Sequence, residues 1–426
     1  MIARSLILLL SLSAGLHAAE PNAAAALKKD PKWLKKIRHS IDSGVAWLVS
    51  KQNASGRFPA FVDPRGDVYE LGMHALATLA VVKGGQPTDS KAVKKAEALI
   101  HSLYKRHKFT IKTYEAGLVL MLLQAKDDVA TFKGGKKKRR RKKKGATRLT
   151  EEDRTLAKEL ALWLQSQQTP EGMWRYPEGG NDISNTQYAI LGLWSAQRMG
   201  LKVDRGVIRR ALKATLKRQQ QDGPKVPRYV PSLDSRYGTW TPLGAKDRAR
   251  AWRYMPAEER LLEDGSTKMM HYPYSGSMTS AGIAILAIGR EILGEKDVWL
   301  DSKQDRLVRT SIYDGLAWIA NNWDVQDNPG QRGNWPFYWL YGLERCGRLT
   351  GVDNMGKHDW YVEGAERIMS DQREDGSWPR TQRMRPPGNQ NVRWWSDQVD
   401  TAFAILFLVQ STPILKIPAP VVSGGE

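Results

Sequence analysis

Two carboxylates near the end of the chain have the spacing of an acid–base pair. Asp397 and Asp400 stand three residues apart at the start of a predicted helix, so both side chains can share one helix face. Paired carboxylates can acquire different pKa values, which is a basis of general acid catalysis. The alternative is that they cap the helix, where the helix dipole favours negative charge. The sequence favours the cap and leaves the catalytic pair open.

Two further acids precede apolar segments. An acid at a helix N-terminus usually balances the helix dipole. If Glu115 is instead buried beside Tyr114, its pKa would rise and it could act as a general acid. The candidate catalytic residues are therefore Asp397, Asp400, Asp182 and Glu115.

Aromatic and polar side chains gather where the apolar segments begin. Such side chains can bind a ligand by ring contacts and hydrogen bonds, and a funnel between helices is the default place for a ligand. The candidate ligand-binding residues are Tyr69, His74, Tyr114, Asn185, Tyr188, Tyr272, Tyr274, Trp335, Tyr338, Glu344, Trp394 and Trp395.

The elements that must position these residues repeat along the chain. The motif Gln-x-x-x-Gly-x-Trp begins at Gln168 and at Gln372, and a looser copy begins at Gln52 with Phe58 in the Trp place. Aligning the preceding segments puts the repeat position at 52, 104, 168, 220, 323 and 372, a period near 50 with two insertions. Such a period predicts a repeat architecture.

Each repeat is predicted to be a pair of helices. The outer helices, at 91–106, 150–168, 205–220 and 305–322, are amphipathic. The partner segments, at 72–82, 116–123, 186–194, 280–288, 337–343 and 401–409, are apolar on several faces, which is typical of buried helices. They are shorter than the roughly 20 residues that span a bilayer. Because the last is as apolar as the others, a closed ring is favoured over an open solenoid. The expected fold is an all-α (α/α)6 toroid of six helix-pair repeats.

These motifs resemble the prenyltransferase and squalene-oxidase repeat superfamily, which includes the toroids of squalene-hopene cyclases and of protein prenyltransferase β subunits. The resemblance covers most of residues 40–410. The segments NDISNTQYA (181–189), YWLYGLERCGRLTG (338–351) and DWY (359–361) resemble secreted repeat proteins of planctomycete-type bacteria. The resemblance implies a central funnel that binds a hydrophobic, isoprenoid-type ligand.

Motifs for the known chemistries of such toroids are missing. Class II cyclases protonate an alkene through Asp-x-Asp-Asp, and this chain has no such motif. Prenyltransferases hold zinc through Asp, Cys and His, whereas Cys346, His358 and Asp359 have a different order and spacing. Thioester toroids need Cys-Gly-Glu-Gln, and Cys346 is followed by Gly-Arg. The prediction is that the protein holds no metal and no cofactor. With a single cysteine, no internal disulfide can form.

Two functions of different class stay open. One is an enzyme-like toroid that binds an isoprenoid-type ligand. If it is an enzyme, it is either terpenoid cyclase-like, as an isomerase or intramolecular transferase, or a carbohydrate-active α/α barrel. The second enzyme class is included because acids and aromatic rings also suit sugars. The other is a non-catalytic periplasmic binding or scaffold protein for a peptide or glycan.

The ends of the chain give its expected location. Arg4, an apolar run at 6–16 and the small Ala18 and Ala19 predict a signal peptide at 1–18, hence a periplasmic or secreted protein without a transmembrane segment in the mature chain. Residues 19–40 and 413–426 are predicted tails around a toroid domain at 41–412.

Two insertions interrupt the repeats. The net charge is +21, and nine consecutive basic residues from Lys136 to Lys144 lie in an insertion at 130–150. This block lacks interleaved aromatic residues, so an anionic surface is expected as its partner and no specific nucleic acid. The insertion at 223–277 is rich in Pro and Tyr and is a possible lid.

Overall fold

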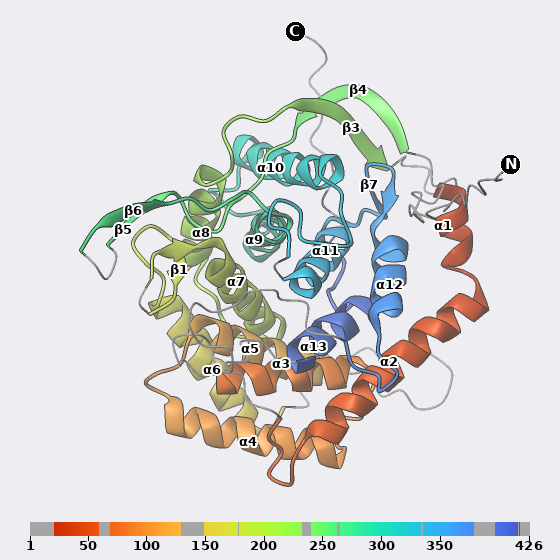
Figure 1. Ribbon diagram of the computed structural model, residues 1–426. Coiled ribbons are helices and arrows are strands. Elements are labelled where there is room, and N and C mark those ends of the chain that lie inside the picture. The colour runs from red at the N-terminus through yellow and green to blue at the C-terminus, as the bar shows by residue number, and fades with distance from the viewer. Residues whose placement is uncertain are drawn as a thin grey trace, which may run out of the picture.

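Two concentric layers of helices form the computed structural model, which describes residues 21–58, 69–128, 149–177, 179–231, 240–261, 265–333, 335–378, 397–415 and 417 (Figure 1). The inner helices are α3 (Glu70–Lys83), α5 (Thr113–Asp128), α7 (Ile183–Arg198), α9 (Gly276–Leu293), α11 (Pro336–Thr350) and α13 (Asp397–Leu408). Each contains one of the predicted apolar segments, and nearly all their residues are buried.

The outer helices are α2 (Pro31–Lys51), α4 (Lys91–His107), α6 (Glu151–Ser166), α8 (Arg205–Lys217), α10 (Ser302–Asn321) and α12 (Trp360–Asp371). Most begin with a side-chain cap. Ser90 accepts a hydrogen bond from the N–H of Val93, and Thr150 forms a capping box with Asp153. These caps mark where the amphipathic helices that the sequence predicts begin.

The inner layer is a closed ring. Each inner helix contacts the next along the chain, and α13 contacts α3. Close approach depends on small residues: a Cβ atom on Gly117 of α5 would lie 2.5 Å from the carbonyl oxygen of Tyr188 in α7. The expected all-α toroid of six helix pairs is confirmed.

The repeated glutamine joins neighbouring pairs. The Nε2 of Gln372 donates to the carbonyl of Gly376 at 3.0 Å and to that of Ser40 in the first outer helix at 2.9 Å. Gln52 and Gln168 make the equivalent bonds in their units. Gly376 has φ +88°, a left-handed conformation that suits glycine. The outer layer is therefore also closed, by the same motif that links α2 to α4 and α6 to α8.

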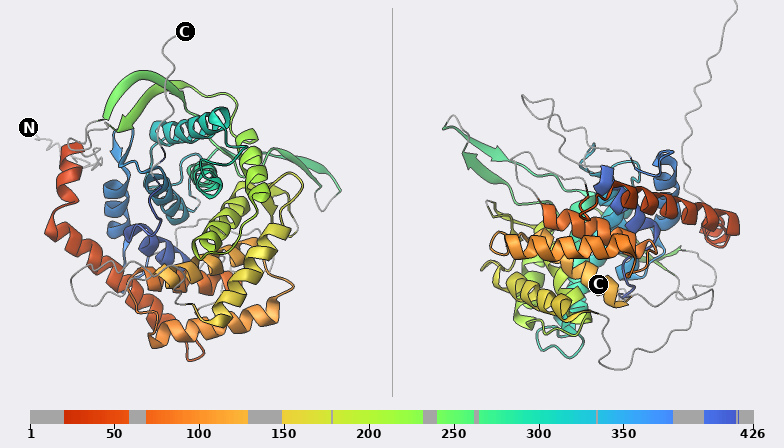
Figure 2. Two further views of the ribbon diagram at one scale, coloured as in Figure 1. Left: turned by 180° about the vertical axis from the view of Figure 1, so that it is seen from behind. Right: turned by 90° about the horizontal axis from the view of Figure 1, so that it is seen from below.

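The long insertion hides another copy of the motif. The indole N–H of Trp174 and of Trp378 donates to a carbonyl of its own outer helix, at 2.8 and 2.7 Å. Trp252 does the same to Thr215 at 2.8 Å, so it is their equivalent. The insertion at 223–277 is thus two pieces: the hairpin of β3 (Lys225–Pro231) and β4 (Trp240–Arg248), and that of β5 (Glu258–Leu261) and β6 (Thr267–Met270). The first packs on α10, and the second projects from the ring (Figures 1 and 2).

The N-terminal segment differs from the expected tail. Residues from Pro21 onward form α1 (Pro21–Leu27) and the first turns of α2. The reason is that Trp33 and Ile37 continue the apolar stripe of α2 and are buried. In addition, Lys28 forms an ion pair with Asp359 at 2.6 Å. The predicted signal peptide and the block from Lys136 to Lys144 lie outside the described residues.

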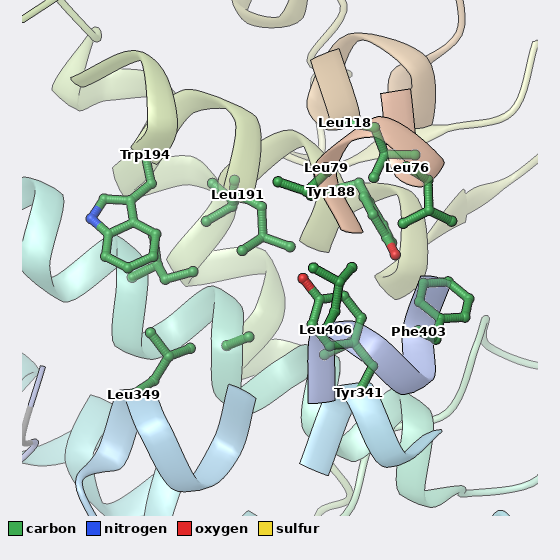
Figure 3. Close-up of a cluster of buried hydrophobic side chains, with 14 of the residues drawn as sticks. Leu76, Leu79, Leu118, Tyr188, Leu191, Trp194, Tyr341, Leu349, Phe403 and Leu406 are labelled. Atoms are coloured by element: carbon green, nitrogen blue, oxygen red, sulfur yellow. The ribbon is translucent and has the colours of Figure 1, made fainter. Parts of the chain in front are cut away.

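Side chains fill the axis of the ring. Figure 3 shows leucine and aromatic side chains that meet there from α3, α5, α7, α11 and α13, and all of them are buried: Leu76, Leu79, Leu118, Tyr188, Leu191, Tyr341, Phe403 and Leu406. Within the described parts of the chain, no helix is both long enough and apolar enough to cross a membrane.

Candidate functional site

The N-terminal ends of the inner helices meet at one end of the ring. Six partly exposed tyrosines there, which we call the tyrosine mouth, come from these ends and the loops before them: Tyr69, Tyr114, Tyr176, Tyr254, Tyr272 and Tyr338. Ring centroids are 6.4 Å apart for Tyr69 and Tyr176, 5.7 Å for Tyr114 and Tyr176, and 5.5 Å for Tyr254 and Tyr272. Aromatic pairs at such distances attract each other, so the mouth is a connected surface.

A chain of hydroxyl groups crosses the mouth. Ser184 of α7 is hydrogen-bonded to the hydroxyl of Tyr114 from α5 and, at 3.0 Å, to that of Tyr338 from α11. The Tyr338 hydroxyl also lies 3.2 Å from Oε1 of Gln187. Because α5 and α11 stand on opposite sides of the ring, this network closes the axis from above. The mouth is therefore shallow and rich in hydroxyl groups.

Asp182 lies beneath these tyrosines. It precedes α7 and is held by the short pairing of β1 (Trp174–Arg175) with β2 (Asn181–Asp182). It is fully buried and accepts bonds from the backbone N–H of Asn185 at 2.6 Å and from its side-chain amide at 2.8 Å. Burial raises the pKa of Asp182 to about 7, although these bonds and the charge of Arg218 lower it. At neutral pH the carboxyl can therefore hold a proton.

The charge of Asp182 affects the pKa values of the mouth tyrosines. Burial raises the pKa of Tyr114, Tyr176 and Tyr254, and the charge of Asp182 raises it further. The same two causes act on Tyr338. Asp182 is thus within electrostatic reach of four mouth residues. The structure brings it together with Tyr69, Tyr114, Asn185, Tyr188, Tyr272 and Tyr338 from the predicted set.

The contacts of Glu115 are with the backbone of neighbouring helix starts. It is buried and accepts the backbone N–H of Lys112 at 3.1 Å and of Gly72 at 3.4 Å. Burial raises its pKa, and these hydrogen bonds lower it. The carboxylate therefore joins the start of α5 to α3.

Asp397 and Asp400 begin α13, as expected. Asp397 forms an ion pair with Arg373 of the preceding turn at 2.8 Å, whereas Asp400 is buried. This geometry agrees with a role at the helix start, and a catalytic pair stays a prediction.

His74 lies behind the mouth. Its Nδ1 accepts the backbone N–H of Phe58 at 3.4 Å, as the hydroxyl of Thr186 does for Trp174 at 3.1 Å. Burial, with a smaller effect from the Arg57 charge, lowers its pKa to about 4, so the ring is neutral. His74 thus replaces the threonine of the repeat.

Three other predicted residues are not among the six tyrosines of the mouth. Tyr274 packs against Arg253, whose Cζ is 5.2 Å from its ring. Trp335 caps α11 in a left-handed conformation with φ 59°. Glu344 is just past the middle of α11, because it comes eight residues after the helix begins, about 12 Å along the axis. Trp394 and Trp395 lie outside the described residues.

Sequence reasoning missed Tyr176, Tyr254 and Arg345. A signal existed for the first two, because Trp-Arg-Tyr occurs at 174–176 and again at 252–254. Arg345 is fully buried in α11, with its Cζ 4.0 Å from the ring centroid of Tyr341 and 5.5 Å from that of Tyr188. Its sequence signal is a cation in the middle of a largely apolar helix.

Metal ligands do not cluster in the part of the chain that the structure describes. Cys346 is buried, His358 bonds Glu363 through Nδ1 at 3.1 Å, and Asp359 caps α12. A pocket of about 360 Å³ lies on the outside of the ring, between α10, β3–β4 and the turn joining β7 (Asn354–Met355) to β8 (His358–Asp359). It is separate from the mouth.

Comparisons with known proteins define the class through the fold. No protein-family model and no curated protein matches the chain in sequence. Its fold is similar to that of a variant of the type II terpene cyclase MstE from Scytonema, with TM-score 0.50, 14% identity and coverage of 89% of this chain and 97% of that one. It is equally similar to the GH76A α-1,6-mannanase from Salegentibacter sp. HEL1_6, with TM-score 0.51, 9% identity and coverage of 88% and 99%.

A third similar structure is an unsaturated glucuronyl hydrolase specific for heparin, with TM-score 0.51, 10% identity and coverage of 88% and 97%. At such low identities the likeness shows the fold alone. The protein is an α/α toroid of the kind that both terpene cyclases and carbohydrate-active enzymes use.

Proposed function

We propose that this protein binds a glycan at the tyrosine mouth. The observation that carries the proposal is the hydroxyl network of Tyr114, Ser184 and Tyr338, which lies among partly exposed rings. Tyrosine rings can pack on the C–H faces of a sugar, while their hydroxyl groups exchange hydrogen bonds with those of the sugar. A shallow, hydroxyl-rich surface suits such a ligand better than a hydrocarbon chain.

Two features weigh against an isoprenoid ligand that is cyclised in the funnel. The axis below the mouth is filled by buried side chains, so a long chain has no ready place there. In addition, Arg345 places a positive charge on the axis. A carbocation intermediate close to that charge would be strongly destabilised in a medium of low dielectric constant.

We propose binding rather than hydrolysis. Glycoside hydrolysis generally uses two carboxyl groups that flank the scissile bond. Asp182 faces the tyrosines and can hold a proton, but Glu70, which adjoins Tyr69, is ion-paired with Arg57. The remaining predicted acids have other partners or positions, as described above.

Export belongs to the same proposal. The charged, apolar and small residues before Ala19 support a cleaved signal peptide, and a glycan ligand suits a periplasmic or secreted protein. The block from Lys136 to Lys144 would then act on an anionic surface of the envelope. Sequencing the N-terminus of the protein from an envelope fraction tests this, and an intact N-terminus in the cytosol would contradict it.

The glycan proposal is tested by screening the intact protein on a glycan array and then measuring affinities by calorimetry. Tyr114→Ala should weaken binding about ten-fold, because a ring contact with its hydrogen bond contributes on the order of 1–1.5 kcal/mol. Trp299→Ala, a matched loss of an aromatic ring at another place, should leave binding unchanged. Retention of a geranylgeranyl lipid with no glycan bound would overturn the proposal.

A further inference from the structure

The guanidinium of Arg345 has no anionic partner in the middle of the ring. The residue is fully buried, and Nε, Nη1 and Nη2 make no hydrogen bond of good geometry with the described residues. The rings of Tyr341 and Tyr188 lie beside it, which favours a cation, and their hydroxyl groups interact with it, but two neutral hydroxyl groups supply no counter-charge for its five N–H groups.

Burying such a group without a partner is costly. A guanidinium stays charged, and removing it from water is repaid only by close acceptors. The adjacent acid in sequence, Glu344, is directed elsewhere: it accepts the N–H of Thr412 at 2.9 Å and its hydroxyl at 2.7 Å. The donors of Arg345 are therefore available to an acceptor from outside the chain.

Arg345 lies one layer of tyrosine side chains below the mouth. The Tyr188 ring separates it from Tyr114, whose ring centroid is 4.5 Å from that of Tyr188. Tyr114 and Tyr338 are partly exposed and meet through Ser184. Rotation of these two side chains, together with that of Tyr188, would open a way from the mouth to the guanidinium.

The rim of the mouth is also cationic. Lys112 holds its Nζ 4.0 Å from the ring centroid of Tyr69, and Arg253 lies against Tyr274. Arg218 donates to the carbonyl of Asn181 at 2.9 Å, beside Asp182. Cations around a surface concentrate anionic ligands there, in a chain whose net charge is +21.

We propose that the glycan is acidic and that Arg345 binds the carboxylate of a uronic acid residue within it. The planar guanidinium can donate two parallel N–H···O bonds to a carboxylate, a geometry that neither an ester nor a neutral sugar reproduces. This inference rests on the proposed function and names the charge class of its ligand.

The test compares acidic oligosaccharides with uncharged copies of themselves. Glucuronate and galacturonate oligosaccharides and the methyl esters of the same oligosaccharides are titrated into the intact protein by calorimetry. We expect the acid forms to bind at least about ten-fold more tightly, as a charged hydrogen-bond pair in a buried site allows. Arg345→Met should remove this preference and keep the affinity for the esters.

Two more variants make the result specific. Arg345→Lys keeps the charge without the planar fork, so it should retain part of the preference. Arg348→Met is the matched control, because Arg348 donates to the carbonyl of Thr412 at 2.8 Å and to Gln410 at 3.0 Å, and it should keep the full preference.

The outcomes separate the two proposals. Equal binding of acid and ester by the wild type would overturn the role of Arg345 and leave the glycan function standing. Binding of neither form would overturn both. If Arg345→Met does not fold, the wild type decides: the acid forms must raise its melting temperature more than the esters at equal concentration.

Discussion

Two regions of the ring each hold a buried acid whose pKa is raised by burial to about 7, and only one of these acids adjoins a partly exposed surface. Asp182 lies under the tyrosine mouth, whereas Glu344, past the middle of α11, is bound by Thr412 of the segment after α13. Burial acts on both acids alike, so a raised pKa does not by itself mark a site. What differs is the partner: a partly exposed aromatic surface for Asp182, and the chain itself for Glu344.

The largest effect on stability is expected at Glu344. Glu344→Ala would leave the N–H and hydroxyl of Thr412 unsatisfied and remove the carboxylate next to Arg345, so the free energy of unfolding should fall by about 3–5 kcal/mol. Urea unfolding measures this loss. The folded variant should still bind the glycan. An unchanged unfolding free energy would contradict a structural role for Glu344.

The titration of Glu344 should also appear in the pH dependence of stability. Its pKa of about 7 in the folded protein exceeds the ordinary value of 4.5, so the folded state binds more protons between these values. Stability is then fully present below about 4.5 and falls as the pH rises towards 7, by on the order of 3 kcal/mol.

Glu344→Gln isolates this contribution. Asp182, whose pKa is also raised, acts in the same direction in both proteins, and His74, whose pKa is lowered to about 4, acts in the opposite direction in both. The unfolding free energy of the variant minus that of the wild type should therefore increase from pH 4.5 to 7, because only the wild type loses the contribution of protonated Glu344. A difference that stays constant over this range would exclude the raised pKa of Glu344.

The sequence predicted the fold better than the site, and there is a physical reason. Burial of an inner helix depends on the residues of that helix alone, so it can be predicted from their period and composition. A site depends on how far a residue lies from the helix start and on what other helices bring to it. Glu344 was grouped with the helix starts, although it comes eight residues into α11, for the first reason. Arg345 was missed for the second, because its neighbour Tyr188 comes from α7.

At the mouth, the acid should matter more for binding than for stability. Asp182→Ala removes a helix N-cap, which costs about 1–2 kcal/mol, and it also releases Asn185 and alters the surroundings of four tyrosines. Affinity for the glycan should fall at least about ten-fold. The control is Asp301→Ala, the N-cap of outer helix α10, which accepts the N–H of Gln304 at 2.8 Å.

Both variants should lose the stability of one helix cap, with a further loss in Asp182→Ala from the released Asn185 amide, and only Asp182→Ala should lose binding. If the two behave alike in calorimetry as well as in unfolding, the acid at the mouth is merely a cap, and the difference between the two regions of the ring disappears.

The smallest effect is expected at Asp397, which shares the mouth end of the ring but not its hydroxyl network. Its ion pair with Arg373 is partly exposed, so Asp397→Asn should lower stability by less than about 1 kcal/mol and leave glycan binding unchanged. Thermal unfolding and calorimetry measure both. A large loss of binding here would shift the centre of the site from Asp182 to the start of α13 and restore Asp397 and Asp400 as a catalytic pair. A small effect would confine the acidic function of this end to the one carboxyl that the tyrosines surround.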